Sequence, residues 1–183
     1  MRSSDTVTLR LLDGDDLADM AALQRVLEEA PGYAERVTGL PVGATDAQST
    51  YSILPPAKSY DDKFVFGIFA GSRMIGCADL IRGWPRPDTA HVGLLLLAEP
   101  YQGKGHGRRA YEALEACIRG WGTCGRVRVG VVQTNAQALP FWRRIGFAPT
   151  GEVKPYSYAD VRSQVVILER QLADAAGSRP GRS

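Results

Sequence analysis

The residues best suited to bind a ligand form a glycine-rich turn, which consists of Gln102, Gly103, Lys104, Gly105, His106, Gly107 and Arg108. Four leucines at positions 94–97 precede the turn, and a helical pattern follows it. Glycine lets the backbone approach a ligand closely, and the N-terminus of a helix favours negative charge. We therefore expect the backbone N–H groups of this turn to bind a pyrophosphate.

Two common phosphate-binding motifs do not account for the turn. Gly105, Gly107 and Ala110 match the loose dinucleotide fingerprint, but that fold also requires an acidic residue about 20 positions later. The chain has no acidic residue between Glu115 and Glu152. A P-loop requires a lysine followed by serine or threonine at the end of the glycine run, and this pair is missing.

Length and charge indicate one domain with an anion-binding second half. The chain has 183 residues and 44% hydrophobic content, which suits a single domain over residues 1–172. The tail at 173–183 is predicted to be disordered. Residues 1–70 carry 11 acidic and 6 basic side chains, whereas residues 71–183 carry 9 and 16. The basic excess lies in the half that contains the glycine turn.

Cysteine and histidine usage argues against a disulfide framework and against a metal site. Cys77, Cys117 and Cys124 are an odd number without metal-type spacing, and the only histidines are His91 and His106. No apolar run approaches the ~18 residues that span a bilayer, and the N-terminus lacks the apolar block of a signal peptide. We expect a cytoplasmic protein with no membrane partner.

The elements that must position the turn follow from hydrophobic periodicity. Strands are predicted at residues 6–11, 63–70, 74–81, 89–97, 126–132, 147–153 and 164–169. Helices are predicted at 17–27, 46–53, 110–121 and 136–144, with Pro31 and Gly32 ending the first and Asn135 capping the last. Residues 33–56 suit either a lid over a substrate pocket or a plain surface connection. These elements predict a mixed α/β fold.

Two segments in this order resemble the GCN5-related N-acetyltransferase (GNAT) family. The first is Gln102-x-x-Gly105-x-Gly107, and the second runs through Asn135, Ala138, Phe141, Trp142, Ile145, Gly146 and Phe147. The resemblance implies a mixed, mostly antiparallel sheet of six to seven strands, flanked by about four helices. The sheet would splay open between its fourth and fifth strands, and acetyl-CoA would lie in that gap as a co-substrate, without a metal.

The resemblance also implies how the donor binds. The pantetheine arm would pair with the backbone of Leu95, Leu96 and Leu97, and a β-bulge near Leu96 and Leu97 would aim one N–H at the thioester oxygen. The N–H groups of residues 102–108 would bind the pyrophosphate. Further cofactor contacts are expected from Asn135, Phe141 and Trp142. Asn135 could instead be only a helix cap. Trp142 is expected to pack against the pantetheine or the core.

Proton transfer is the second requirement, because a protonated amine cannot attack a thioester. His91 stands where histone-acetylating relatives carry a glutamate and is the first candidate base, although it could be an ordinary strand histidine. Glu99 and Asp79 are the next candidates. Many family members protonate the thiolate with a tyrosine at the position of Trp142, which cannot act as an acid. Tyr156 or Tyr158 could replace it, or form a wall of the substrate pocket.

These observations predict acetyl transfer from acetyl-CoA to a primary amine of a small molecule, by direct attack in a ternary complex. If the protein is an enzyme, the alternative to acetyl-CoA is an aminoacyl-tRNA as the acyl donor, which the basic second half of the chain would suit. If the protein is not an enzyme, it could be a module that binds acyl-CoA without catalysis. The lack of a tyrosine at the position of Trp142 supports this alternative. The oligomeric state stays open, with a homodimer as one option.

Overall fold

The computed structural model describes residues 6–172, so the predicted tail at 173–183 lies outside the described residues. Seven strands form one sheet in the order β1-β2-β3-β4-β5-β7-β6, and only the β4–β5 pair is parallel. This confirms the predicted mixed, mostly antiparallel sheet. The strands are β1 (Val7–Leu11), β2 (Lys63–Ala70), β3 (Arg73–Arg82), β4 (Thr89–Leu97), β5 (Arg126–Val132), β6 (Ala148–Tyr158) and β7 (Val161–Gln171).

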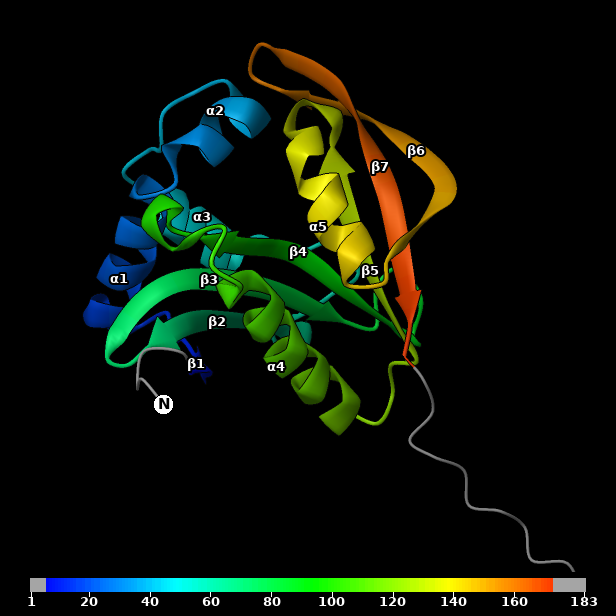
Figure 1. The fold of residues 1–183 in the computed structure, drawn as a ribbon, viewed down its shortest axis with the longest axis horizontal. Helices are drawn as coiled ribbons and strands as arrows, with labels where there is room; N and C mark the ends of the chain where they lie inside the picture. Colours follow the sequence, from blue (N-terminus) through cyan, green and yellow to red (C-terminus); the bar gives the residue numbers. More distant parts are fainter. Residues whose placement is uncertain (1–5, 173–183) are drawn as a thin grey trace, which may run out of the picture.

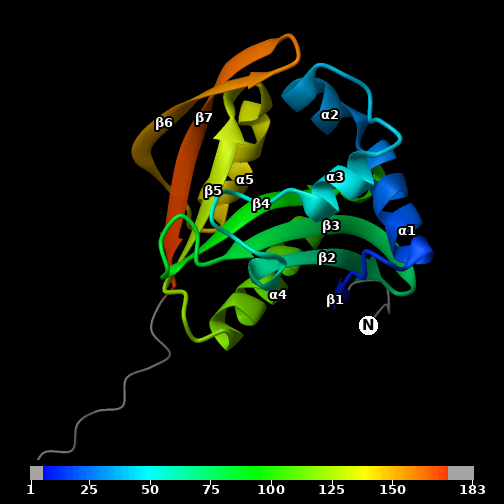
Figure 2. The same cartoon turned by 180° about the vertical axis from the view of Figure 1, so that it is seen from behind.

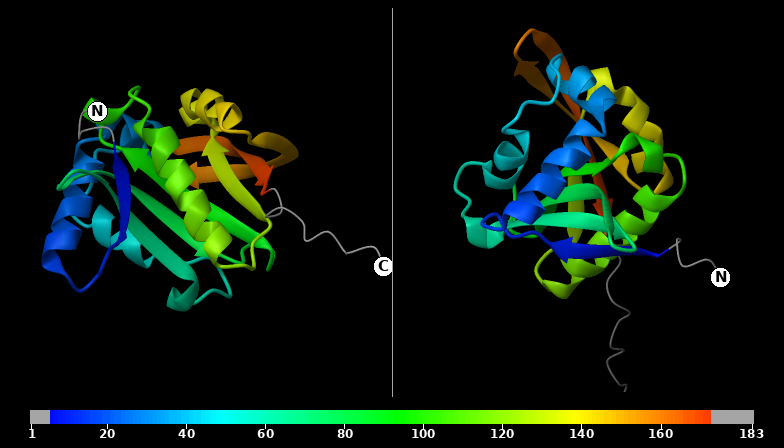
Figure 3. Two further views of the ribbon diagram at one scale, coloured as in Figure 1. Left: turned by 60° about the horizontal axis from the view of Figure 1, so that its bottom comes forward. Right: turned by 90° about the vertical axis from the view of Figure 1, so that its left-hand side faces the viewer.

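Helices cover both faces of the sheet (Figures 1 and 2). The α-helices are α1 (Leu17–Glu28), α2 (Pro31–Thr38), α3 (Asp46–Ser52), α4 (His106–Gly120) and α5 (Leu139–Arg144), and the short 3-10 helices are η1 (Tyr60–Asp62), η2 (Glu99–Tyr101) and η3 (Gln133–Ala138). The left view of Figure 3 shows α4 lying across the strands of one face. Among the described helices, none combines the length and apolar character that crossing a bilayer requires.

The core has two main parts, one on each face of the sheet. On the α4 and α5 face, Tyr111, Leu114 and Ile118 pack against alternate residues of β5 and against Trp142. On the other face, α1 contributes Leu23 to a cluster with β2 and β3 residues. A helix buries one stripe of its surface and a strand buries alternate residues, so both faces of the central strands become inaccessible to water.

The sheet opens between β4 and β5, as predicted. These strands pair over four positions only, from Thr89 opposite Arg126 to Val92 opposite Val129. Beyond that point the strands separate, and Figure 1 shows β1–β4 and β5–β7 diverging from their common end. The edge of β4 from residue 93 onward therefore has no strand beside it on the β5 side, and this edge leads directly to the glycine turn.

The helix predictions are wrong at two positions. Pro31 and Gly32 do not simply end a helix, because α1 ends at Glu28 and Pro31 begins the additional helix α2. Proline suits the first helical position because the N–H that it lacks would have no partner there. Asn135 does not cap a helix over 136–144: it has non-helical φ and ψ inside η3, and α5 begins only at Leu139.

The strand predictions need two corrections. β6 and β7 are longer than predicted, so Tyr156 and Tyr158 lie on β6 rather than in a loop. The β-bulge lies upstream of its predicted place at Leu96 and Leu97, since Leu80 pairs with Val92 and Asp79 pairs with Leu94. Gly93 is thus the extra residue of β4, as is common where a glycine interrupts a strand.

Candidate functional site

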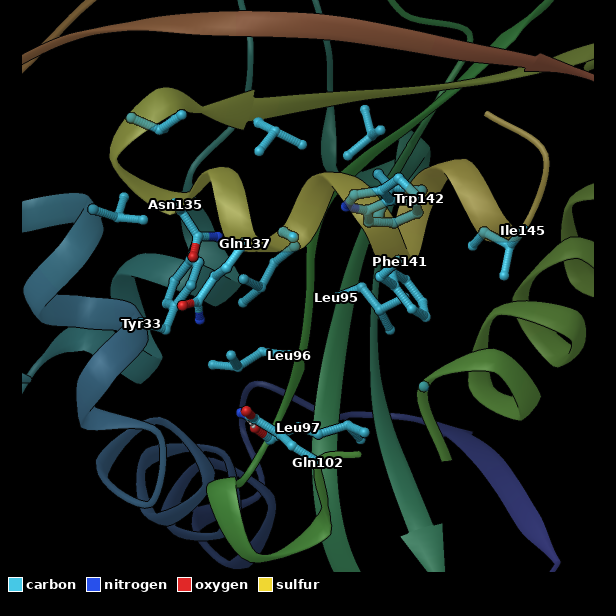
Figure 4. A pocket seen from close by; sticks show the side chains of 18 of the residues that line it. Tyr33, Leu95, Leu96, Leu97, Gln102, Asn135, Gln137, Phe141, Trp142 and Ile145 are labelled. Atoms are coloured by element: carbon cyan, nitrogen blue, oxygen red, sulfur yellow. Dashed lines mark hydrogen bonds between the residues drawn. The ribbon is translucent and has the colours of Figure 1, made fainter. Parts of the chain in front are cut away.

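A cavity of about 570 Å³ occupies the gap between the separated ends of β4 and β5 (Figure 4). Its walls come from both strands, from α2, from the turn before α4, and from η3 with α5. The lining residues on the two strands include Gly93, Leu94, Leu95, Leu96, Leu97, Gly130, Val131 and Val132. The cavity therefore lies where the split of the sheet exposes backbone edges.

The glycine turn forms one end of this cavity. Gly103 and Gly105 have positive φ angles of 71° and 82°, and Gly105 is the N-cap residue of α4. A Cβ atom added at either glycine would meet nothing within 4 Å, so the turn has an open surface. Gln102 ties the turn to the sheet, because its Nε2 donates to the Leu97 carbonyl at 2.8 Å. The geometry suits an anion held by backbone N–H groups.

The basic side chains of the turn contribute less than its backbone. Lys104 Nζ donates to the Pro100 carbonyl, and Lys104 does not line the cavity. His106 is buried, and its Nδ1 has no hydrogen-bond partner among the described residues. Arg108 lines the cavity mouth, where its exposed side chain pairs with Glu112. We therefore expect the backbone to supply most of the binding.

The side chains of the leucine run belong to the core while their backbone borders the cavity. Leu96 and Leu97 are buried, and Leu95 and Phe141, both labelled in Figure 4, pack against the same core cluster. Phe141 also lies against Gly107, where a Cβ atom would be 3.3 Å from its ring. Gly107 thus lets α4 approach α5 closely, and the two helices hold the turn in place.

Trp142 lines the cavity but is mainly a core residue. Its side chain is nearly inaccessible and meets Phe147 and Phe141 in edge contacts, with ring centroids 5.0 Å and 5.1 Å apart. Tyr111 makes a third edge contact at 6.1 Å. Such aromatic pairs stabilise beyond their buried area by about 0.5–1.5 kcal/mol each.

Helix α2 bridges the two halves of the splayed sheet. Arg36 Nε donates to Asn135 Oδ1 at 2.9 Å, and the Gln137 amide, oriented to satisfy both groups, accepts from Arg36 Nη2 at 2.8 Å. Tyr33 points toward Asn135 and Gln137 in Figure 4. Burial raises the pKa of the Tyr33 hydroxyl to about 12, so this group stays protonated near neutral pH.

Comparison with known proteins identifies the family. The profile described as the Acetyltransferase (GNAT) family matches residues 21–147, which is more than half of the chain. The chain belongs to the GNAT family. None of the curated proteins compared with the chain matches it.

Solved structures of other acetyltransferases share the fold. An acetyltransferase from Thermus thermophilus is 25% identical, with a TM-score of 0.72 over 92% of this chain and 99% of its own. The ribosomal-protein-S18-alanine N-acetyltransferase from Escherichia coli is 18% identical, with a TM-score of 0.66 over 97% and 100%. A GNAT family acetyltransferase from Elizabethkingia anophelis with acetyl-CoA bound is 13% identical, with a TM-score of 0.63 over 92% and 99%.

Two predicted proton-transfer residues of this GNAT protein bind α2. The Glu99 carboxylate accepts from the Gly32 N–H at 3.0 Å, at the N-terminus of α2, where negative charge is favourable. The Tyr156 hydroxyl donates to the Val37 carbonyl near the other end of α2 at 2.9 Å. Neither residue lines the cavity. Both therefore have a structural contact that accounts for their position.

His91, the first predicted base, lies outside the cavity lining. Its ring meets Trp84 edge-on with centroids 4.7 Å apart, and its buried Nδ1 has no partner among the described residues. Burial lowers the pKa of His91 to about 4, with smaller contributions from the charges of Arg128 and Lys154. The imidazole is thus neutral near pH 7 and enclosed by the protein.

Sequence reasoning did not find the α2 part of the site. Tyr33, Arg36 and Gln137 belong to segments without a recognisable motif, and their roles depend on contacts with distant residues. Gly93 and Gly130, which face each other across the split, could have been suspected because each interrupts a β-rich run. Within residues 6–172, no group of three or more His, Cys, Asp or Glu could hold a metal ion.

Proposed function

We propose that this GNAT protein transfers an acetyl group from acetyl-CoA to a primary amine of a small molecule, by direct attack in a ternary complex. One observation carries the proposal: the unpaired edge of β4 beyond Val92 runs directly into an open glycine turn at the N-terminus of α4. An extended ligand with a phosphate group at one end fits this arrangement.

The donor would use backbone groups along the whole cavity. Its pantetheine arm would pair with Leu95, Leu96 and Leu97 like an added strand, and the N–H groups of residues 102–108 would hold the pyrophosphate. Phe141, Trp142 and Asn135 remain proposed contacts. Phe141 and Trp142 line the same cavity, and Asn135 lies at its α2 side.

The thioester would lie near the bulge at Gly93. We place the backbone N–H donor to the thioester oxygen at this bulge rather than at Leu96, because a bulge turns backbone groups out of the regular ladder. A preorganised donor of this kind contributes about 3 kcal/mol to the transition state. The acceptor would approach from the α2 side, where Tyr33 and Arg36 form the wall.

The roles of His91, Glu99 and Tyr156 in proton transfer stay predictions. Each has another contact in this structure, so a test must separate a chemical effect from a structural one. The substitutions His91→Ala, Glu99→Gln and Tyr156→Phe, each with measured stability and thiol release, provide that separation. A residue that transfers protons alters the pH dependence of the rate, whereas a structural residue alters only stability.

The experiment that tests the function is a thiol-release assay with acetyl-CoA and a panel of amines. The panel contains simple alkylamines, polyamines, amino sugars and amino acids. Peptides with N-terminal alanine or serine are added, because the Escherichia coli neighbour is named for an alanine of ribosomal protein S18 and a Salmonella typhimurium neighbour for the N-terminal serine of ribosomal protein L7/L12. We expect release that depends on one amine class and produces the acetylated amine. CoA binding without release for any amine would favour the acyl-CoA-binding module instead.

The aminoacyl-tRNA donor is tested in the same assay. If tRNA served as donor, activity would require aminoacyl-tRNA and fall steeply with salt, because phosphate contacts release counterions. Activity with acetyl-CoA alone that is insensitive to moderate salt would exclude this alternative.

A further inference from the structure

A partly buried carboxylate lies directly behind the bulge that we place at the thioester. Asp79 of β3 pairs with Leu94, and Gly93 is the extra residue between Leu94 and Val92. Gly93 is exposed and lines the cavity. A Cβ atom at Gly93 would lie 2.9 Å from Asp79 Oδ2. The missing side chain therefore leaves the carboxylate beside the cavity wall at the split of the sheet.

A single lysine orients this carboxylate. Lys63 of β2 donates from Nζ to Asp79 Oδ1 at 2.8 Å, and the two side chains are only 1% and 16% exposed. Burial raises the pKa of Asp79, and the nearby Lys63 charge opposes that effect. Because Oδ1 receives the lysine, Oδ2 is the oxygen that faces Gly93.

Other groups around the cavity are poor proton acceptors. The ionisable residues in its lining are Tyr33, Arg36, Arg108 and Arg144, and none of these carries a free base near neutral pH. Glu99 is held by the N-terminus of α2, and His91 lies outside the lining. Asp79 is not a lining residue either, but its Oδ2 lies directly behind the lining residue Gly93, at the point where we place the thioester.

We propose that Asp79, oriented by Lys63, accepts the proton that the acceptor ammonium loses before attack. This inference rests on the proposed acetyltransferase function. The amine nitrogen forms a bond to the acetyl carbonyl carbon, the carbon–sulfur bond breaks, and its electron pair goes to the CoA sulfur. Before attack, the ammonium form of the acceptor passes one proton to Asp79 Oδ2, and the proton that the nitrogen loses after attack goes to the CoA sulfur, which leaves as the thiol. Asp79 is then a catalytic residue and Lys63 a positioning residue.

The same carboxylate would select the acceptor. An ammonium group can donate to Asp79 Oδ2, the oxygen that does not receive Lys63, and this charge-assisted hydrogen bond opposes the repulsion from the Lys63 charge. Acceptors with a compact cationic amine are therefore expected to bind at the split, next to Gly93, whereas neutral nucleophiles such as alcohols are expected to be poor substrates.

The first test is Asp79→Asn, which keeps the shape and removes the base. Loss of a general base costs about 100-fold or more in rate. We expect at least a 100-fold fall in kcat, with the KM for acetyl-CoA changed less than threefold. Asp62→Asn is the control, because Asp62 also pairs with a lysine, Lys58, at 2.9 Å, in a more exposed site away from the cavity. It should lower stability and keep the rate.

The second test uses Lys63→Met and the pH profile. Removing the Lys63 charge raises the pKa of Asp79 further, so the acid limb of kcat/KM should move to higher pH while the variant stays active. Besides Arg73 and Arg82, the other titratable groups on these strands are Cys77 and His91. Burial and the Asp79 charge raise the pKa of Cys77 to about 12, and burial lowers that of His91 to about 4. An acid limb that moves with His91→Gln and not with Lys63→Met would overturn the inference.

A third readout does not depend on turnover. The carboxyl carbon of Asp79 is followed by ¹³C NMR in the CoA-saturated protein while propylammonium chloride is added. We expect a saturable shift of this carbon, and no such shift with neutral propanol at the same concentration. Failure of all amines in thiol release would contradict the proposed function alone. A wild-type enzyme that turns over, together with an unaffected Asp79→Asn variant or an unshifted carbon, would overturn the role of Asp79.

Discussion

Burial of the His91 imidazole disfavours its protonated form, and the stability of the protein should therefore depend on pH. The pKa of His91 is about 4 in the folded protein, against about 6.5 for an unperturbed histidine. As pH falls, the unfolded chain binds the proton first. The contribution of neutral His91 to the free energy of unfolding is therefore fully present above pH 6.5 and is lost as the pH falls from 6.5 to about 4.

We expect the free energy of unfolding to fall by about 2 kcal/mol between pH 7.5 and pH 5 because of this residue. Urea unfolding of the wild type and of His91→Gln measures the effect. In the variant, the free energy of unfolding should depend much less on pH between 7.5 and 5. Carboxylates with a lowered pKa, such as Asp19, affect the free energy of unfolding only at lower pH. If the free energy of unfolding fell equally with pH in both proteins, protonation of His91 would not destabilise the fold.

Gly93 offers a second test at the scale of one residue. Alanine at this position would place Cβ 2.9 Å from Asp79 Oδ2, which is closer than carbon and oxygen normally approach. The carboxylate must then shift away from the cavity wall, and we expect the acetyl transfer rate to fall about 10-fold or more, since a misplaced catalytic group loses much of its effect.

Gly125→Ala is the control for this substitution, because a Cβ atom there would meet nothing within 4 Å and Gly125 does not line the cavity. Its rate of thiol release should equal that of the wild type. If Gly93→Ala also kept the full rate, the cavity wall at the bulge would have no part in positioning the reacting groups.

At the scale of elements, α2 is held by contacts from both halves of the sheet. Glu99 binds its N-terminus, Tyr156 binds near its C-terminus, and Arg36 binds Asn135 of η3. A hydrogen bond to a charged group contributes about 1.5–3 kcal/mol. Arg36→Met should therefore weaken the attachment of α2 to η3 by about 2 kcal/mol, which corresponds to roughly 30-fold faster amide exchange in α2.

Hydrogen exchange resolved along the chain measures this effect. The α2 amides should exchange faster in Arg36→Met, with the strands unchanged. Arg25→Met is the matched control, since Arg25 of α1 donates to the Met74 carbonyl and pairs with Glu29 away from the cavity. Loss of protection in α2 for both variants would mean that α2 responds to general destabilisation rather than to its bond with η3.

The same helix shows what sequence could and could not predict. Strand positions and the glycine turn follow from local patterns, and the two family segments indicate the split of the sheet. The N-terminus of α2 binds a carboxylate 67 residues from Gly32, and the bulge at Gly93 depends on its pairing with β3. Local pattern carries no information about such contacts, so the glycine turn was predictable and the α2 wall of the cavity was not.

At the scale of the whole molecule, the two halves around the cavity are connected by four residue pairs between β4 and β5, by α2 and by the core under α4. A ligand that contacts both halves should stabilise the fold, because it binds the folded chain and not the unfolded one. Acetyl-CoA at 100 times its Kd would add about 2.7 kcal/mol. For a chain of this size that corresponds to a rise in Tm of about 5–10 °C.

Two glycine substitutions test whether this stabilisation passes through the glycine turn. Gly105 and Gly122 have positive φ angles of 82° and 68°, and a Cβ atom at either would meet nothing within 4 Å. Alanine costs about 1–2 kcal/mol in such a conformation, so the Tm of both variants should fall by a similar amount without ligand.

Of these two glycines, only Gly105 borders the cavity, where an added methyl group would occupy the space that a phosphate needs. We therefore expect acetyl-CoA to raise the Tm of Gly122→Ala as in the wild type and that of Gly105→Ala by less than half as much. Equal shifts in both variants would contradict a pyrophosphate site on this turn, because the two substitutions differ only in their distance from the proposed donor.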